Sequence, residues 1–186
     1  RNDLRVLILT GAGRSFSAGV DLKEMNKSIQ DGQFTADDIM REGVDFIELI
    51  ETMPQVTIAM INGFCFTGAL ELARAFDLLY CCESAKIGDT HAKWGIQPRW
   101  GMTQRLPQRI GQLQARELSF TAETITGLAA AEIGLVNRVF PNDALESGVD
   151  QIIAKILNNS AQTISAIKTL YQFGSQRTLS EGLENE

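Results

Sequence analysis

The stretch from Thr57 to Ala73, TIAMINGFCFTGALELA, constrains the fold and the chemistry more than any other part of the chain. It begins with an apolar run rich in β-branched residues, which predicts a buried strand, and Asn62-Gly63 then predicts a turn. Thr67 and Gly68 open a short apolar helix that carries Glu71, with Thr67 as its expected N-cap. The pattern therefore predicts a strand, a turn and a helix in close succession.

Gly68 and Glu71 are the candidate catalytic pair of this helix. A backbone N–H in the first turn has no acceptor within the helix, so it suits an oxygen that carries negative charge. Glu71 follows three residues later on the same face, so its carboxyl lies near the same point. A catalytic pair of this kind combines an oxyanion donor with a carboxylic acid. The alternative is an ordinary helix whose Glu faces water, and these residues alone favour neither.

Four segments, in the expected order, resemble the motifs of the enoyl-CoA hydratase/isomerase (crotonase) superfamily. INGFCFTGALELARAFDLLYC is similar to its central strand, Gly-rich turn and E-L-A helix, and FSAGVDLKEM is similar to its upstream hallmark. GMTQRLPQRIG and AAEIGLVNRVFP match two later segments. These motifs extend over most of the chain from Val6 to about Leu157, and on them the chain is identified as a member of this superfamily.

The resemblance implies an α/β fold: a spiral of strand–strand–helix turns, followed by a helical region through which family members form trimers or hexamers. Residues 1–140 are expected to form the spiral core, and residues 141–186 the helical C-terminal region. Family members have a β-hairpin region ahead of this point and further helices after it. The chain is therefore expected to lack parts at both ends.

Composition excludes several functional classes. The 186 residues, 44% of them hydrophobic, predict one globular domain. The net charge of −6 argues against a nucleic-acid partner, and no apolar run is long enough to span a membrane. Cys65, Cys81 and Cys82 indicate buried thiols in a reducing compartment. We therefore expect a cytoplasmic protein, unless an organellar targeting peptide precedes residue 1.

The remaining pattern predicts further elements by periodicity and caps. Strands are expected over Arg5–Thr10, Leu78–Cys82, Ala85–Thr90 and Leu135–Phe140. Helices are expected over Thr35–Met53, Arg99–Gly111, Leu113–Thr121, Thr124–Glu132, Asp143–Leu157 and Ala161–Phe173. The polar segment Met25–Phe34 is expected to be a mobile loop over the acyl pocket. The acidic residues of the helix over Thr35–Met53, including Glu51, are expected to face solvent.

The family resemblance also implies a binding site for the coenzyme A thioester. The backbone N–H of Ala18 corresponds to the second donor of the oxyanion hole, beside that of Gly68. Gly19, Val20 and Asp21 correspond to residues that line the path of the CoA moiety. Backbone donors suit this task because their direction is fixed. Coenzyme A is part of the substrate, so no separate cofactor is expected.

The acid and base of the reaction are where the sequence departs from the family. Hydration of a 2-enoyl thioester needs a base to activate water and an acid to protonate C2. The resemblance implies two glutamates; Glu71 matches the first, but His91 stands at the position of the second. A histidine can transfer protons at neutral pH, and Asp89, expected on the same strand face, would orient it. Alternatively, His91 only shapes the pocket.

Bulky residues replace small ones at the acyl end of the expected pocket. Pro98 is followed by Arg99 and Trp100 where the family has glycines. With Asp89 and Trp94, these residues are expected to shape the pocket and to favour a small or polar acyl group. His91 is the single histidine, so a multi-histidine metal site is excluded and no metal is expected.

We interpret the chain as an acyl-CoA-processing enzyme that stabilises a thioester enolate, foremost an enoyl-CoA hydratase. The alternatives are an isomerase with Glu71 as the single base, a decarboxylase, or a hydrolase that uses Asp89 and His91. A further alternative is a non-catalytic acyl-CoA-binding protein. The presence of Glu71 together with both oxyanion segments favours an enzyme.

Overall fold

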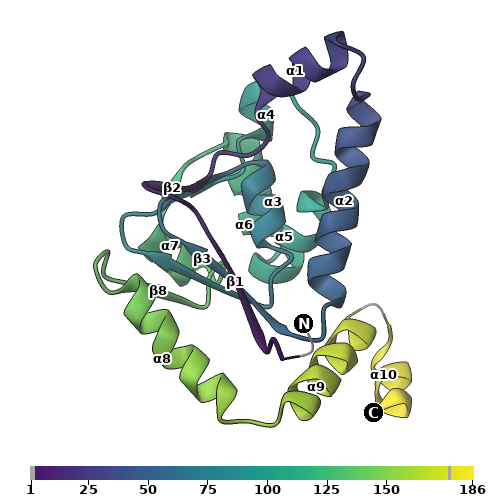
Figure 1. Ribbon diagram of the computed structural model, residues 1–186, viewed down its shortest axis with the longest axis vertical. Coiled ribbons are helices and arrows are strands. Elements are labelled where there is room, and N and C mark those ends of the chain that lie inside the picture. Colours follow the sequence, from purple (N-terminus) through teal and green to yellow (C-terminus); the bar gives the residue numbers. More distant parts are fainter. Residues whose placement is uncertain (1–2, 176) are drawn as a thin grey trace.

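The strands of the computed structural model form two four-stranded sheets, and the described residues are 3–175 and 177–186 (Figure 1). The expected spiral core, residues 1–140, includes residues 1 and 2, and the expected helical C-terminal region, residues 141–186, includes residue 176. These three residues lie outside the described part. The first sheet has the order β1 (Val6–Thr10), β3 (Val56–Ile61), β5 (Leu78–Cys82) and β8 (Arg138–Phe140). The second has the order β2 (Ser15–Ser17), β4 (Phe64–Phe66), β6 (Lys86–Gly88) and β7 (Ile125–Thr126). All pairs are parallel except β6 with β7.

Each turn of the chain adds one strand to each sheet, which confirms the predicted spiral of strand–strand–helix turns. The helices are α1 (Leu22–Gln30), α2 (Ala36–Thr52), α3 (Gly68–Ala73), α4 (His91–Trp94), α5 (Met102–Ile110), α6 (Gln112–Thr121), α7 (Gly127–Glu132), α8 (Leu145–Leu157), α9 (Ala161–Gly174) and α10 (Leu179–Asn185). After β1 and β2 come α1 and α2; after β3 and β4 comes α3; after β5 and β6 come α4 to α6. In Figure 1, α9 and α10 lie at the end of the molecule where β1 begins.

The core gathers between the sheets and the helices. Ile58 and Ile61 of β3, Leu70 of α3 and Leu79 of β5 are completely buried, as their apolar runs predict. Removing such side chains from water is the main favourable term in folding. The segment that carries Glu71 is thus fixed to the best-buried part of the protein. The three cysteines are free and buried.

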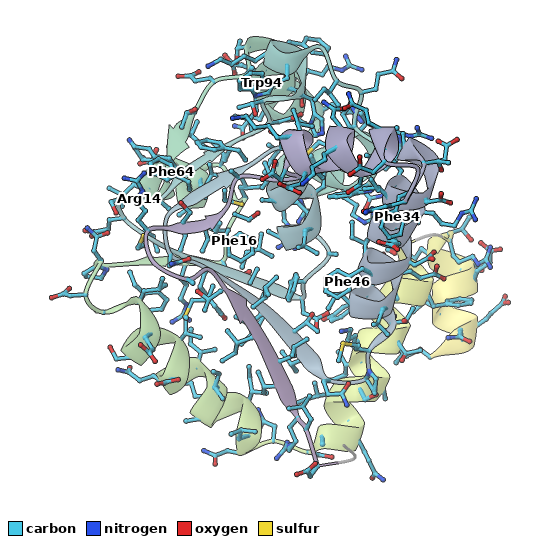
Figure 2. The ribbon with its side chains drawn as sticks, turned by 45° about the horizontal axis from the view of Figure 1, so that its top comes forward. Arg14, Phe16, Phe34, Phe46, Phe64 and Trp94 are labelled. Atoms are coloured by element: carbon cyan, nitrogen blue, oxygen red, sulfur yellow. The ribbon has the colours of Figure 1, made fainter. Side chains whose placement is uncertain are left out.

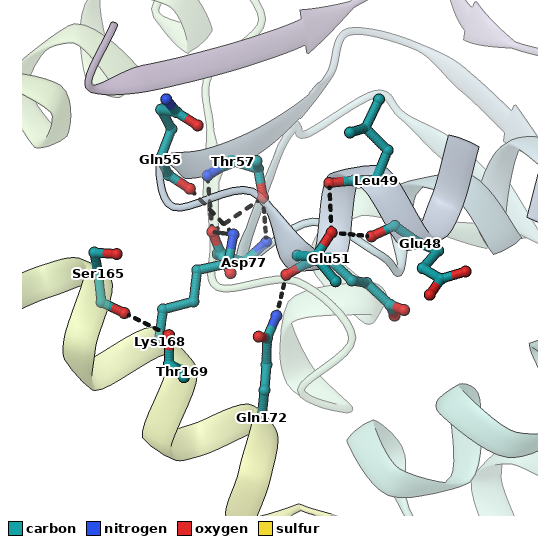
Figure 3. Close-up of polar contacts among 11 residues, drawn as sticks. Glu48, Leu49, Glu51, Gln55, Thr57, Asp77, Ser165, Lys168, Thr169 and Gln172 are labelled. Atoms are coloured by element: carbon teal, nitrogen blue, oxygen red, sulfur yellow. Dashed lines mark hydrogen bonds and ion pairs between the residues drawn. The ribbon is translucent and has the colours of Figure 1, made fainter. Parts of the chain in front are cut away.

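A polar network joins α9, a helix of the C-terminal region, to this core (Figure 3). Asp77 Oδ2 accepts hydrogen bonds from the backbone N–H of Thr57 at 2.8 Å and from its hydroxyl at 3.0 Å. Lys168 of α9 donates to the same oxygen at 2.8 Å and to the carbonyl of Gln55 at 3.1 Å. The Gln172 side chain donates to the Glu51 carbonyl. Thr57 is the second residue of β3, the strand that leads toward Glu71, so this network anchors α9 to β3.

The predicted loop over Met25–Phe34 is wrong, because α1 occupies most of it. Asp21 caps this helix: its carboxylate accepts from the N–H groups of Lys23 at 3.0 Å and Glu24 at 3.2 Å. None of the α1 side chains is fully buried, and its nine residues include only three large apolar ones, Leu22, Met25 and Ile29, so the segment is polar on average.

The predicted N-cap at Thr67 is also wrong. Thr67 has a φ of 54°, and its side chain caps no backbone N–H. Its hydroxyl contacts that of Thr90 instead, while its carbonyl accepts from the N–H groups of Leu70 and Glu71. Thr35, by contrast, caps α2 as predicted, in a capping box with Asp38.

Several predicted bounds need correction. The strand expected over Ala85–Thr90 is β6 alone, so Asp89 follows a strand and His91 begins α4; the two are not on one strand face. The helix expected from Arg99 begins only at Met102, and the elements expected over Thr124–Glu132 and Leu135–Phe140 are shorter, with Ile125–Thr126 forming β7. Glu51 does not simply face solvent, because Arg105 binds both of its carboxylate oxygens at 2.6 and 2.8 Å.

Candidate active site

Glu71 lies at the centre of the site, in the first turn of α3. It is only 3% exposed. Its Oε1 accepts two backbone hydrogen bonds, from the N–H of Trp100 at 2.9 Å and from that of Met102 at 3.0 Å. Two donors on one oxygen fix the orientation of the carboxylate and leave Oε2 for another partner. The surface-helix alternative for Glu71 is therefore excluded by its burial.

That partner is His91, the first residue of α4. His91 Nε2 lies 3.3 Å from Glu71 Oε2, and His91 Nδ1 lies 2.6 Å from Asp89 Oδ1. The His91 backbone N–H also donates to Asp89 Oδ1 at 3.3 Å. All three side chains are buried. The imidazole ring thus bridges two carboxylates, one on each nitrogen.

The electrostatics of this bridge favour a protonated ring. Burial opposes the charge on His91, but the hydrogen bonds and negative charges of Asp89 and Glu71 outweigh it and raise its pKa to about 9. Burial likewise acts against the charge of Asp89, but hydrogen bonds from His91 and Ser119 and the charge of His91 outweigh it, so the pKa of Asp89 is lowered. The two carboxylates therefore favour the protonated form of the ring, in which each nitrogen carries a proton facing one of them.

The bridge opens into a pocket of about 650 Å³. The two predicted oxyanion segments meet there: a Cβ added to Gly19 would lie 3.4 Å from the backbone N of Gly68. The pocket is lined by ten of the residues singled out from the sequence, namely Ala18, Gly19, Val20, Asp21, Gly68, Glu71, His91, Trp94, Arg99 and Trp100. Asp89 does not line it but lies behind His91.

The bulky residues of the predicted acyl end differ in their placement. Trp94 is 63% exposed at the outer end of α4 (Figure 2). The Arg99 guanidinium forms an exposed ion pair with Asp37 at 3.3 Å. Trp100 is half-buried, and its indole Nε1 donates to the carbonyl of Met40 at 3.1 Å. Of these three residues, Trp100 is the one that extends furthest into the protein.

Two features of the site were not predicted from the sequence. The backbone around Trp100 holds Glu71, and α2 contributes to the pocket lining. The N–H groups of Trp100 and Met102 hold Glu71, but a backbone contact of this kind leaves no signal in residue type. Met40 of α2 lines the pocket and accepts from Trp100, yet in the sequence it is only an apolar residue of an amphipathic helix.

A metal site does not emerge from the described residues. In 3–175 and 177–186, no group of three or more His, Cys, Asp or Glu side chains lies close enough to hold an ion. Within the same residues, none of the helices is both long enough and apolar enough to cross a membrane.

The family model for enoyl-CoA hydratase/isomerase matches residues 1–186. The chain belongs to this family, the crotonase superfamily. It is 35% identical over 183 residues to the probable peroxisomal enoyl-CoA hydratase 1 of Arabidopsis thaliana, covering 98% of this chain and 67% of that protein. These matches make the chain an enzyme of the family and leave the reaction type open.

Solved structures agree with this family membership. An enoyl-CoA hydratase from Bacillus anthracis superposes with a TM-score of 0.90 at 36% identity, over 99% of this chain and 70% of that one. A putative enoyl-CoA hydratase from Thermobifida fusca, solved in complex with CoA, has a TM-score of 0.90 at 26% identity, over 99% of this chain and 74% of that one. The chain thus spans about two thirds to three quarters of the length of these relatives.

Proposed function

We propose that this chain carries the active site of an enoyl-CoA hydratase, which adds water to the double bond of a 2-enoyl-CoA thioester. One observation supports it above all: His91 lies between Asp89 and Glu71, with an acid and a base in contact at the pocket wall. Hydration requires such a pair, whereas isomerisation can proceed with a single base. The names of the relatives point the same way.

Glu71 is the base and His91 the acid in this proposal. Glu71 Oε2 takes a proton from water as its oxygen bonds to C3 of the thioester. The π electrons of the double bond move onto the thioester oxygen to give an enolate. His91, charged at neutral pH because its pKa is raised to about 9, then delivers a proton to C2. Asp89 stabilises the charged ring and holds its orientation through Nδ1.

The enolate oxygen is stabilised by the backbone N–H groups of Gly68 and Ala18. Gly68 is the first residue of α3, so its N–H has no acceptor within that helix. Ala18 follows β2 directly and lines the same pocket, and the neighbouring Gly19 lies against Gly68. Donors already in place require no reorganisation when the charge develops.

The Glu71–His91 contact also allows both side chains to return to their starting protonation states after each turnover. After one turnover Glu71 holds the proton taken from water, and His91 has lost one to C2. Transfer from Oε2 to Nε2, which lie 3.3 Å apart, restores both groups. The net change is the addition of one water molecule, and no cofactor beyond the CoA part of the substrate takes part.

Thioester hydrolysis is the second candidate, and the 2.6 Å contact between Asp89 and His91 favours it. In that reaction His91 would act as a base toward water that attacks the carbonyl carbon. A base must be neutral at the working pH, whereas the flanking carboxylates hold His91 protonated. This difference makes hydration the better supported reaction.

The full-length protein should be assayed with short 2-enoyl-CoA thioesters at neutral pH. Hydration removes the conjugated enoyl absorbance without releasing thiol, whereas hydrolysis releases free CoA. Double-bond migration gives an isomer of unchanged mass, and decarboxylation of a malonyl-type thioester gives carbon dioxide. Thiol release at the rate of substrate loss would replace the hydratase assignment with the hydrolase one.

We further propose a cytoplasmic homotrimer or homohexamer that acts on small-molecule thioesters rather than on nucleic acid or membranes. The buried free thiols fit a reducing compartment, and the acidic balance of the chain fits the absence of nucleic acid. The Arabidopsis relative is named peroxisomal, so an organellar location is the competing outcome. Light scattering and localisation of the full-length protein test both points.

A further inference from the structure

Arg99 and Trp100 lie between the active-site pocket and a second cavity. The second cavity has a volume of about 820 Å³ and lies among α2, α5 and α9. Most of its lining residues are polar or charged, among them Glu48, Glu51, Arg105 and Arg109. Its apolar side chains include those of Val44 and Ile47 from α2 and of Phe76. Within the described part of the chain, Arg99 and Trp100 are the residues that line both spaces. These two residues are therefore the candidates for the wall between the two cavities.

The indole of Trp100 fills the gap between α2 and α3. On one side its Nε1 donates to the Met40 carbonyl, and a Cβ added to Gly43 would lie 2.2 Å from the ring atom Cε2. On the other side, a Cβ added to Gly68 would lie 2.9 Å from Cζ3. A glycine at each contact lets the ring approach both backbones closely. The ring thus extends from α2 to the first residue of α3.

The backbone of Trp100 is fixed as firmly as its ring. Its N–H donates to Glu71, and its carbonyl accepts from Arg105 Nη1 at 2.8 Å. Arg105 is itself held by two bonds to Glu51. Arg99, by contrast, has a side chain 56% exposed and makes one surface ion pair, which holds a long side chain weakly. Trp100 is therefore the rigid element of the division.

We propose that the Trp100 indole is the end wall of the acyl pocket and limits the substrate to short acyl groups. The inference rests on the proposed function in one respect: it takes the pocket beside Glu71 and His91 as the acyl site. Without the indole, the pocket of about 650 Å³ would open into the cavity of about 820 Å³. A longer acyl chain could then lie against Val44 and Ile47.

Binding of saturated acyl-CoA thioesters to the full-length protein tests this proposal without any turnover. Calorimetry with butyryl-, hexanoyl-, octanoyl- and decanoyl-CoA gives the affinity as a function of chain length. For the unaltered protein we expect affinity to fall beyond the short chains. For Trp100→Ala we expect the ratio of octanoyl- to butyryl-CoA affinity to rise at least about tenfold, since each methylene newly removed from water contributes about fourfold.

Two further variants keep the test decisive. Trp100→Leu retains apolar volume between α2 and α3, so it protects the fold, and it should shift the same ratio in the same direction by less. Phe120→Ala removes an exposed aromatic side chain of α6, outside both cavities, and should leave the ratio unchanged. An unchanged ratio in both Trp100 variants, or tight octanoyl-CoA binding by the unaltered protein, would overturn the end wall.

Failure of the end wall and failure of the hydratase proposal give different results. If the protein binds acyl-CoA with the expected dependence on chain length but does not hydrate enoyl-CoA, the proposed reaction is wrong and the end-wall proposal stands. If the protein hydrates enoyl-CoA but the Trp100 variants leave the ratio of octanoyl- to butyryl-CoA affinity unchanged, the proposed reaction stands and the end-wall proposal is wrong. If no acyl-CoA binds, both proposals are wrong.

Discussion

His91 Nε2 lies 3.3 Å from Glu71 Oε2, although the two residues belong to successive turns of the spiral. Glu71 comes from the helix after β4, and His91 from the short helix after β6. Because β4 and β6 are parallel neighbours, their carboxyl ends meet at one edge of the sheet. The contact between the proposed base Glu71 and the proposed acid His91 is thus a direct consequence of strand pairing.

Replacing Glu71 by Gln removes the base and keeps the shape of the side chain. We expect kcat for hydration to fall by about 10²–10⁴, the usual contribution of a positioned acid or base. Loss of the negative charge should also lower the pKa of His91, because Glu71 is one of the two groups that raise it. Steady-state kinetics and NMR titration of the His91 ring measure these two effects.

The matched control for this change is Glu48→Gln on the exposed side of α2, which should alter neither quantity. An unchanged kcat in Glu71→Gln would remove Glu71 from the catalytic role. A lowered kcat with an unchanged His91 titration would mean that the two side chains are not coupled as their distance implies.

His91 sets the alkaline limb of the pH–rate profile if it is the acid. Its pKa is raised from 6.5 to about 9, so the working protonated form persists through neutral pH and is lost as the pH rises through about 9. We expect kcat/KM to fall above that value. Glutamine does not titrate, so His91→Gln should have a much lower kcat and its kcat/KM should not fall as the pH rises through about 9.

The competing interpretation of His91 gives a different pattern. If the ring only shapes the pocket, His91→Gln changes KM or the acyl preference and leaves kcat and its pH dependence almost intact. Asp89→Asn provides an independent check, because it removes one of the carboxylates that hold the ring charged and should shift the limb to lower pH.

Secondary structure was predictable where caps and apolar runs are strong. The cap residue Thr35 predicts the start of α2, and the apolar runs of β1, β3 and β5 predict three of the four strands of the first sheet. α1 was missed because it buries no side chain, and because its cap, Asp21, had been interpreted as a residue of the CoA path. Local signals thus identify elements that bury a face more reliably than elements that carry only a cap, such as α1 and α10.

Site residues were predictable by type and motif, but their contacts were not. Glu71 and His91 were singled out from the sequence, yet the bond from the Trp100 N–H to Glu71 depends on the path of the chain before α5. The start of α5 was misplaced for the same reason: Gly101 has a φ of 98°, so the backbone turns there and the helix begins only at Met102. Glycine tolerates a positive φ, but it does not require one, so its presence alone did not predict the turn.

The backbone N–H of Ala18, the proposed second oxyanion donor, can be removed by a single substitution. Proline has no backbone N–H, so Ala18→Pro should lower kcat by about 10²–10³, the typical effect of losing one such donor. Ala18→Ser keeps the N–H and serves as the control, with kcat expected close to that of the unaltered protein. Binding of free CoA, measured by calorimetry, should survive in both variants. Equal kcat values for the two variants would remove Ala18 from the oxyanion hole.

The contacts that join α9 to β3 through Asp77 should contribute to the free energy of unfolding. Lys168 has a side chain only 9% exposed, and it donates to Asp77 Oδ2 and to the Gln55 carbonyl. Lys168→Met keeps the apolar stem and removes both charge-assisted bonds, so we expect the free energy of unfolding to fall by about 2 kcal/mol. Urea denaturation of the full-length protein measures this change.

The control is Lys155→Met on the exposed face of α8, where we expect a change within about 0.5 kcal/mol. Thr57→Val removes the hydroxyl that bonds Asp77 from the other side, at 3.0 Å. Because Lys168 and Thr57 share one carboxylate, the double variant should lose less than the sum of the single losses. Additive losses would show that α9 and the strand are held independently, and hydrogen exchange along β3 in Lys168→Met would then remain as slow as in the unaltered protein.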